Sequence, residues 1–136
     1  FPTRRSSDLV LVGVIAACGG SSSGGAGQSP APAAGPSEAD LKLAVFAYSD
    51  AFLGGHGDRA YDMLSRRCQA ENDATRFGNL VRGSHILYGD ETIKTLTVDS
   101  FSATTATVTY LYGNRNIDQH NQRWTVEGGQ WRWDGC

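Results

Sequence analysis

The chain has 136 residues, of which 40% are hydrophobic and 19% are charged, and its formal net charge is −2. This length fits a single domain with a tail. The slight negative charge argues against nucleic-acid binding, which needs a clustered basic surface. No apolar run reaches the roughly 18 residues of a membrane-spanning helix. We therefore expect no nucleic-acid partner and exclude a multi-pass membrane protein.

Residues 1–9 (FPTRRSSDL) look like the translation of a DNA sequencing-library adapter, and we leave them out of the fold prediction. The alternative is a genuine charged n-region of an export signal, supplied by Arg4 and Arg5. If the adapter interpretation is right, the natural start of the protein lies outside this sequence.

Residues 10–18 are typical of a truncated lipoprotein signal peptide. An apolar run, VLVGVIAA, ends in small residues directly before Cys18, and it is too short to span a bilayer. The segment IAAC resembles a bacterial lipobox, in which the cysteine is lipidated. The alternative is a buried strand with a free thiol, but the polar tract that follows offers no strand partner. We expect an exported protein, anchored through Cys18 by lipid on the extracytoplasmic face of the cell membrane.

Residues 19–36 (GGSSSGGAGQSPAPAAGP) contain no charged and no aromatic residue. Such a composition cannot bury enough apolar surface to offset the entropy of ordering, so we expect a disordered linker. Its typical reach is about 25 Å.

Residues 37–136 form the expected folded domain, which contains two cysteines, Cys68 and Cys136. An even pair in an exported protein favours a disulfide. The alternative is two free thiols, one in a helix and one at a frayed end of the chain.

The first helix is predicted to begin at Ser37, which forms a capping-box-like start with Asp40, and to end at Gly54 and Gly55. Its apolar residues recur at helical spacing: Leu41, Val45, Tyr48 and Phe52.

Two further helices are predicted after Gly55. The second begins at Asp58, with its apolar positions at Tyr61, Leu64 and Cys68. The third is capped by Asn72 or Asp73 and ends near Gly83. The apolar face of the third helix is expected to contain Phe77, Leu80 and Val81.

Strands are predicted over residues 92–101 and 104–112, where Thr, Val and aromatic residues dominate. The second of these strands places four residues on one face: Ala106, Val108, Tyr110 and Tyr112.

Gly128 and Gly129 predict a two-residue hairpin turn. The resulting register pairs Val126 with Trp131, Trp124 with Trp133, Thr125 with Arg132, and Arg123 with Asp134. A shift of one residue would mix the apolar and polar faces, so the register is well specified. We expect an α+β fold in which the N-terminal helices pack on a curved, mainly antiparallel sheet.

Five segments together resemble small exported actinobacterial lipoproteins of the nuclear-transport-factor-2-like superfamily: residues 64–68 (LSRRC), 87–89 (LYG), 106–112 (ATVTYLY), 117–119 (IDQ) and 131–136 (WRWDGC). The resemblance covers residues 37–136 and implies a cystatin-like cone, with helices inside a bent sheet and often a pocket between them. The family pattern also agrees with a Cys68–Cys136 bridge. Relatives include ketosteroid-isomerase-like and polyketide-cyclase-like enzymes as well as members that only bind, so the fold alone leaves function open.

Two carboxylates, Asp99 and Asp118, are candidates for acid–base catalysis. Asp118 lies two positions before His120 in the chain. For each, a surface or loop role is the favoured alternative. His85 and His56 fit a helix end and a turn better than catalysis. We find no metal-ligand spacing, nucleotide-binding glycine loop or nucleophile motif, and we expect no metal and no cofactor.

Tyrosines are candidates for lining a pocket, and the set comprises Tyr48, Tyr61, Tyr88, Tyr110 and Tyr112. The alternative is an ordinary aromatic core. The leading hypothesis is a non-catalytic module of the cell envelope that binds a small apolar ligand or a protein. The rival hypotheses are an isomerase-like or cyclase-like enzyme using Asp99 or Asp118, and a domain that forms a homodimer through the outer face of its sheet.

Overall fold

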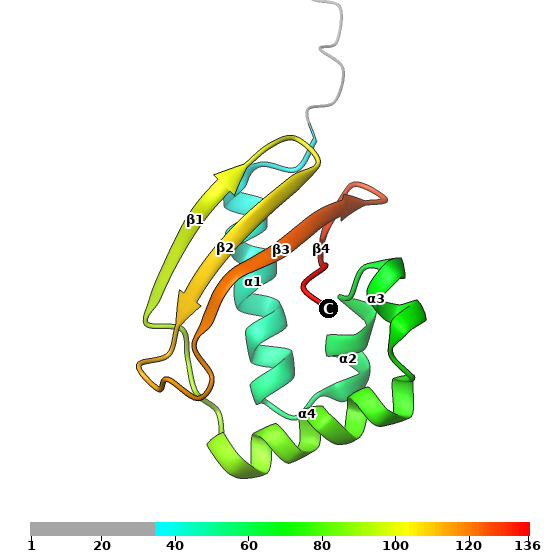
Figure 1. Cartoon of the computed structure of the whole chain (residues 1–136), viewed down its shortest axis with the longest axis vertical. Coiled ribbons are helices and arrows are strands. Elements are labelled where there is room, and N and C mark those ends of the chain that lie inside the picture. Colours follow the sequence, from blue (N-terminus) through cyan, green and yellow to red (C-terminus); the bar gives the residue numbers. More distant parts are fainter. Residues whose placement is uncertain (1–34) are drawn as a thin grey trace, which may run out of the picture. The chain divides into compact units, whose positions relative to one another are not determined.

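The computed structural model describes residues 35–136 (Figure 1). The predictions for residues 1–34, including the adapter segment, the lipobox with Cys18 and most of the linker, lie outside the described residues. In the part described, the helices are α1 (Glu38–Leu53), α2 (Gly57–Asp62), α3 (Arg66–Glu71) and α4 (Ala74–Tyr88). The strands are β1 (Thr95–Phe101), β2 (Thr105–Leu111), β3 (Gln119–Glu127) and β4 (Gln130–Trp133).

The four strands form one antiparallel sheet in the order β1-β2-β3-β4. Helix α1 runs alongside this sheet, and α2, α3 and α4 follow it before the chain enters β1 (Figure 1). The predicted α+β class with an antiparallel sheet is therefore confirmed.

The start of α1 follows the predicted capping box. The Ser37 hydroxyl accepts a hydrogen bond from the Asp40 amide at 3.1 Å, and the Asp40 carboxylate accepts one from the Ser37 amide at 2.7 Å. These bonds satisfy two donors that a helix start leaves without intrahelical partners. The helix ends at its C-cap, Gly54, as predicted.

The prediction of one helix from Asp58 to Cys68 is wrong, because two short helices occupy this stretch. Helix α2 has His56 at its N-cap position and ends at Asp62. Leu64 then forms a parallel bridge with Trp133, which takes the backbone out of helical geometry. Helix α3 begins after Ser65, whose hydroxyl accepts a hydrogen bond from the Cys68 amide at 3.1 Å.

Helix α4 begins after Asp73, as predicted, but it continues past Gly83 to Tyr88. Its C-cap is Gly89, whose φ is 69°. This left-handed backbone conformation favours glycine, which has no side chain. Phe77 and Val81 are buried as expected, whereas Leu80 is 58% exposed and does not belong to the core.

The predicted hairpin register is confirmed for the three pairs that lie within β3 and β4. Val126 pairs with Trp131, Trp124 with Trp133 and Thr125 with Arg132. Beyond these pairs, Asp134 donates its amide hydrogen to the Arg123 carbonyl at 2.8 Å.

The core lies between α1 and one face of the sheet. The four predicted inward residues of the β2 segment are all buried: Ala106, Val108, Tyr110 and Tyr112. They meet the buried face of α1, which contains Leu41, Val45, Tyr48 and Ala51. The Trp124 indole is also fully buried, and its N–H has no hydrogen-bond partner among the described residues.

The predicted bridge between Cys68 and Cys136 is present, with the two Cα atoms 5.6 Å apart. It joins α3 to the segment that follows β4 and closes a sequence separation of 68 residues. In an entropy model, a closure of this length destabilises the unfolded chain by about 4 kcal/mol.

Candidate functional site

A cavity of about 300 Å³ lies beside the core, and its lining residues come mainly from α1, α4, the β2 segment and β4. Aromatic rings make up most of its wall: Tyr48, Phe52, Phe77, Tyr110, Tyr112 and Trp133. The remaining lining residues are Ser49, Leu53, Asn72, Leu80, Ile117, Gln119 and Cys136. Volumes of this size match the lower end of small-molecule sites, which are typically apolar with a few polar groups.

The positions of three tyrosines on the β2 segment and α1 bring their side chains to the same cavity. Tyr110 and Tyr112 are two positions apart along the chain, so they lie on the same face of the sheet, and their rings meet edge to face at 6.0 Å. Tyr48 approaches from α1 and stacks on Trp133 with ring centroids 5.4 Å apart and an interplanar angle of 13°.

Only one hydrogen bond links the hydroxyl groups of the cavity wall. It joins the Tyr112 hydroxyl to the Ser49 hydroxyl at 2.7 Å. The hydroxyl protons of Tyr48 and Tyr110 find no acceptor within residues 35–136.

Burial controls the ionisation of these phenols. It raises the pKa of Tyr48 and of Tyr110 well above the usual value of 10.0. It also raises the pKa of Tyr112 to about 12, although the hydrogen bond with Ser49 acts in the opposite direction. All three phenols are therefore neutral at physiological pH and present O–H donors.

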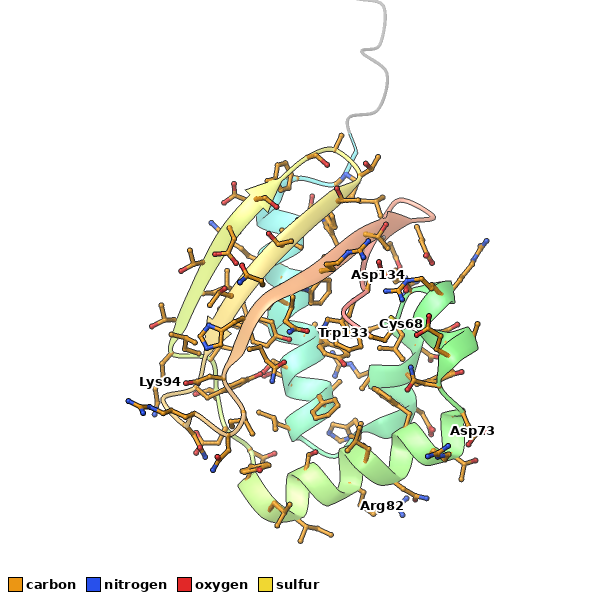
Figure 2. All side chains as sticks on the ribbon, in the orientation of Figure 1. Cys68, Asp73, Arg82, Lys94, Trp133 and Asp134 are labelled. Carbon is orange, nitrogen blue, oxygen red and sulfur yellow. A yellow bond between two sulfur atoms is a disulfide. The ribbon has the colours of Figure 1, made fainter. Side chains whose placement is uncertain are left out.

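Hydrogen bonds to a distant segment, residues 63–65, hold Trp133 in the cavity wall. Trp133 donates its amide hydrogen to the Met63 carbonyl at 2.9 Å, and its carbonyl accepts from the Ser65 amide at 2.8 Å. Asp134 is 7% exposed and accepts hydrogen bonds from Ser65 and Arg67. Figure 2 shows Trp133, Asp134 and Cys68 close together between the sheet and the helices that follow α1.

The two candidate catalytic carboxylates lie away from the cavity. Asp99 is exposed on the outer face of the sheet, where it accepts a 2.7 Å hydrogen bond from the Thr109 hydroxyl. Asp118 accepts hydrogen bonds from the amides of Tyr112 and Gly113 at 2.7 and 3.2 Å, which shapes the loop between β2 and β3. Neither carboxylate lines the cavity, so the structure brings no acid–base pair to it.

The histidines also have structural positions. His85 places Nδ1 2.6 Å from the Leu53 carbonyl and so ties α4 to the end of α1. His56 precedes α2, and His120 is exposed on β3. Residues 35–136 contain no group of three or more His, Cys, Asp or Glu side chains that could hold a metal ion.

Three of the predicted pocket tyrosines, Tyr48, Tyr110 and Tyr112, line the cavity, whereas Tyr61 and Tyr88 do not. The Tyr61 hydroxyl donates to the carbonyls of Gln69 and Asn72, which accounts for it in a purely structural role. Sequence reasoning missed Ser49, although its place beside Tyr48 on the buried side of α1 was a usable signal. Asn72 is the C-cap of α3 and Gln119 begins β3, and no pattern in the sequence links these two positions.

Comparison of the chain with protein-family models, with curated proteins and with solved structures found no match. In the described part of the chain, none of the helices combines the length and the apolar character that crossing a bilayer requires.

Proposed function

We propose that the domain binds a small, largely apolar ligand in the tyrosine-lined cavity. The observation that carries this proposal is the cavity itself, about 300 Å³ in a domain of this size, with aromatic walls and no charged side chain in its lining. Small-molecule sites are typically concave and mostly apolar, with a few polar groups that orient the ligand. An unfilled apolar space of this volume supports ligand binding over a purely structural core.

We further propose that the domain is a nuclear-transport-factor-2-like cone. Support comes from the antiparallel sheet, from α1 packed on its inner face, and from a cavity between helices and sheet. The sequence features of residues 10–18 support a lipid anchor at Cys18, which would hold the domain at the extracytoplasmic face of the membrane.

Ligand binding is tested with 2-ethylnaphthalene, an apolar probe that fits a cavity of this size. Nuclear magnetic resonance titration of the full chain should shift the indole N–H signal of Trp133, because this ring forms part of the wall. Leu80→Trp, at the rim of the cavity, should weaken binding at least tenfold by filling the entrance.

Leu87→Trp is the matched control, since it makes the same change on the same helix at a residue that is 75% exposed and does not line the cavity. Binding that is absent in the unmodified protein, or equally strong in both variants, would reject the cavity as a ligand site.

The anchor is tested separately by detergent phase partition of the full chain expressed with a complete signal peptide. The protein should enter the detergent phase, and Cys18→Ala should move it to the aqueous phase. Ser22→Ala is the control and should partition like the unmodified protein. A Cys18→Ala variant that stays in the detergent phase would contradict lipidation at this residue.

A further inference from the structure

We infer that the ligand is an uncharged molecule with a hydrogen-bond acceptor of the carbonyl type, which binds the hydroxyl groups of Tyr48 and Tyr110. This inference rests on the proposed function and names the chemical class that the cavity selects.

Two tyrosine hydroxyl groups at the cavity have no hydrogen-bond acceptor within residues 35–136. Tyr48 is 5% exposed and Tyr110 is 2% exposed, and both line the cavity. Neither O–H proton has an acceptor among the described residues, whereas the hydroxyl of Tyr61, outside the cavity, donates to two carbonyls at 3.0 and 3.1 Å. Trp124 Nε1 is the one fully buried side-chain polar atom without a partner among the described residues, so the hydroxyl oxygens of Tyr48 and Tyr110 are open to the cavity that they line, where an acceptor on a ligand can reach their protons.

None of the neighbouring polar groups in residues 35–136 accepts a hydrogen bond from either hydroxyl. The Trp133 indole N–H, which lies near Tyr110, is only a donor, and it is directed to the Gln122 side-chain oxygen at 3.2 Å. The amide groups of Asn72 and Gln119 donate to backbone carbonyls at 2.8 and 3.0 Å, which fixes these side chains. An acceptor on the ligand would complete the bonding of Tyr48 and Tyr110.

The cavity offers no charged group to a ligand. The lining contains no Asp, Glu, Lys, Arg or His side chain. The nearby guanidinium of Arg67 is already paired with Asp134 at 3.1 Å and with Glu71 at 3.1 Å. A carboxylate in the cavity would therefore be buried without a cationic partner, which is strongly unfavourable. The cavity accordingly favours a neutral acceptor over an anion.

The test compares three probes with the same ring system: 2-acetylnaphthalene, 2-ethylnaphthalene and 2-naphthoate. Isothermal titration calorimetry of the full chain at neutral pH should show the ketone binding roughly tenfold more tightly than the ethyl compound, as expected for two buried hydrogen bonds that contribute about threefold each. The carboxylate should bind at least tenfold more weakly than the ketone.

Tyr48→Phe and Tyr110→Phe each remove one oxygen atom and keep the ring. Each should reduce the advantage of the ketone over 2-ethylnaphthalene, with both affinities measured in the same variant, to about threefold, and the double variant should abolish it. Tyr88→Phe, at a half-buried tyrosine outside the lining, is the control and should leave all three affinities unaltered.

The outcomes separate this inference from the proposed function. Binding of none of the three probes would overturn both. Equal binding of the ketone and the ethyl compound, or tighter binding of the carboxylate, would overturn the inference and leave the cavity as a ligand site. A ketone preference that survives in the double variant would also overturn it, because the acceptor would then bind elsewhere.

Discussion

The Ser65 hydroxyl donates a 2.6 Å hydrogen bond to the carboxylate of Asp134, 69 residues further along the chain. The same hydroxyl accepts the Cys68 amide at 3.1 Å, so one side chain caps α3 and also fixes the end of β4. Because Asp134 directly follows Trp133, this contact holds one wall of the cavity in place.

Replacing Ser65 should therefore cost more stability than replacing an ordinary helix cap. We expect Ser65→Ala to lower the free energy of unfolding by about 2–3 kcal/mol, since it removes a cap and leaves the buried Asp134 without one of its donors. Ser37→Ala, at the exposed cap of α1, should cost about 1 kcal/mol. Urea unfolding of both variants provides the measurement, and equal losses would show that the bond to Asp134 contributes nothing.

Reduction of the Cys68–Cys136 bridge should lower the free energy of unfolding by about 4 kcal/mol, because the unfolded chain regains the entropy of a long open loop. The check is urea unfolding with and without reductant, together with a thiol assay that confirms reduction. The double variant Cys68→Ala/Cys136→Ala should be similarly destabilised and should not respond to reductant. An unchanged midpoint in the reduced protein would contradict this expectation.

Local signals predicted the elements whose boundaries depend on adjacent residues. The capping box of Ser37 and Asp40 and the turn at Gly128 and Gly129 are short-range features, and both occur where the sequence indicated. The boundary at Leu64 could not be predicted in this way. It depends on the pairing of Leu64 with Trp133, and this residue becomes a neighbour only after the sheet has formed.

Tertiary contacts also explain the errors in α4 and in the site. The helix continues past Gly83 because later residues are tied down, as when His85 contacts the Leu53 carbonyl. The tyrosines of the site were predictable from their type and spacing. The volume of the cavity between them could not be predicted, because it depends on the packing distances between α1, α4 and the sheet.

The buried phenols should make stability fall at alkaline pH. Burial raises the pKa of Tyr112 to about 12 and those of Tyr48 and Tyr110 further above the usual 10.0. The unfolded chain therefore releases these protons first, so their contribution is complete below about pH 10 and is lost as the pH rises through the folded pKa values.

The free energy of unfolding should decline between about pH 10 and pH 12 by up to about 1.4 kcal/mol per pH unit for each phenol. Urea unfolding across this range gives the slope, and Tyr112→Phe should make it shallower. A slope that is identical in Tyr112→Phe would mean that this phenol ionises equally in the folded and unfolded protein.

Two glycines should respond to alanine with opposite signs. A Cβ atom added at Gly57 would lie 2.7 Å from the Cα atom of Gly78, so Gly57→Ala must push α2 and α4 apart. We expect a loss of about 1–3 kcal/mol, as for other overpacked contacts. At Gly83, within α4, no heavy atom lies within 4 Å of an added Cβ. Gly83→Ala should raise stability by about 0.5–1 kcal/mol through helix propensity.

Urea unfolding of Gly57→Ala and Gly83→Ala gives the sign directly. Binding of 2-ethylnaphthalene adds a second readout, because Phe77 and Leu80 of the cavity wall lie on α4. Displacement of α4 by Gly57→Ala should weaken binding, whereas Gly83→Ala should leave it unchanged. If both variants were destabilised, α4 would not tolerate an added methyl group even at Gly83, where there is space for it. The loss in Gly57→Ala could then not be attributed to the close approach of α2 and α4.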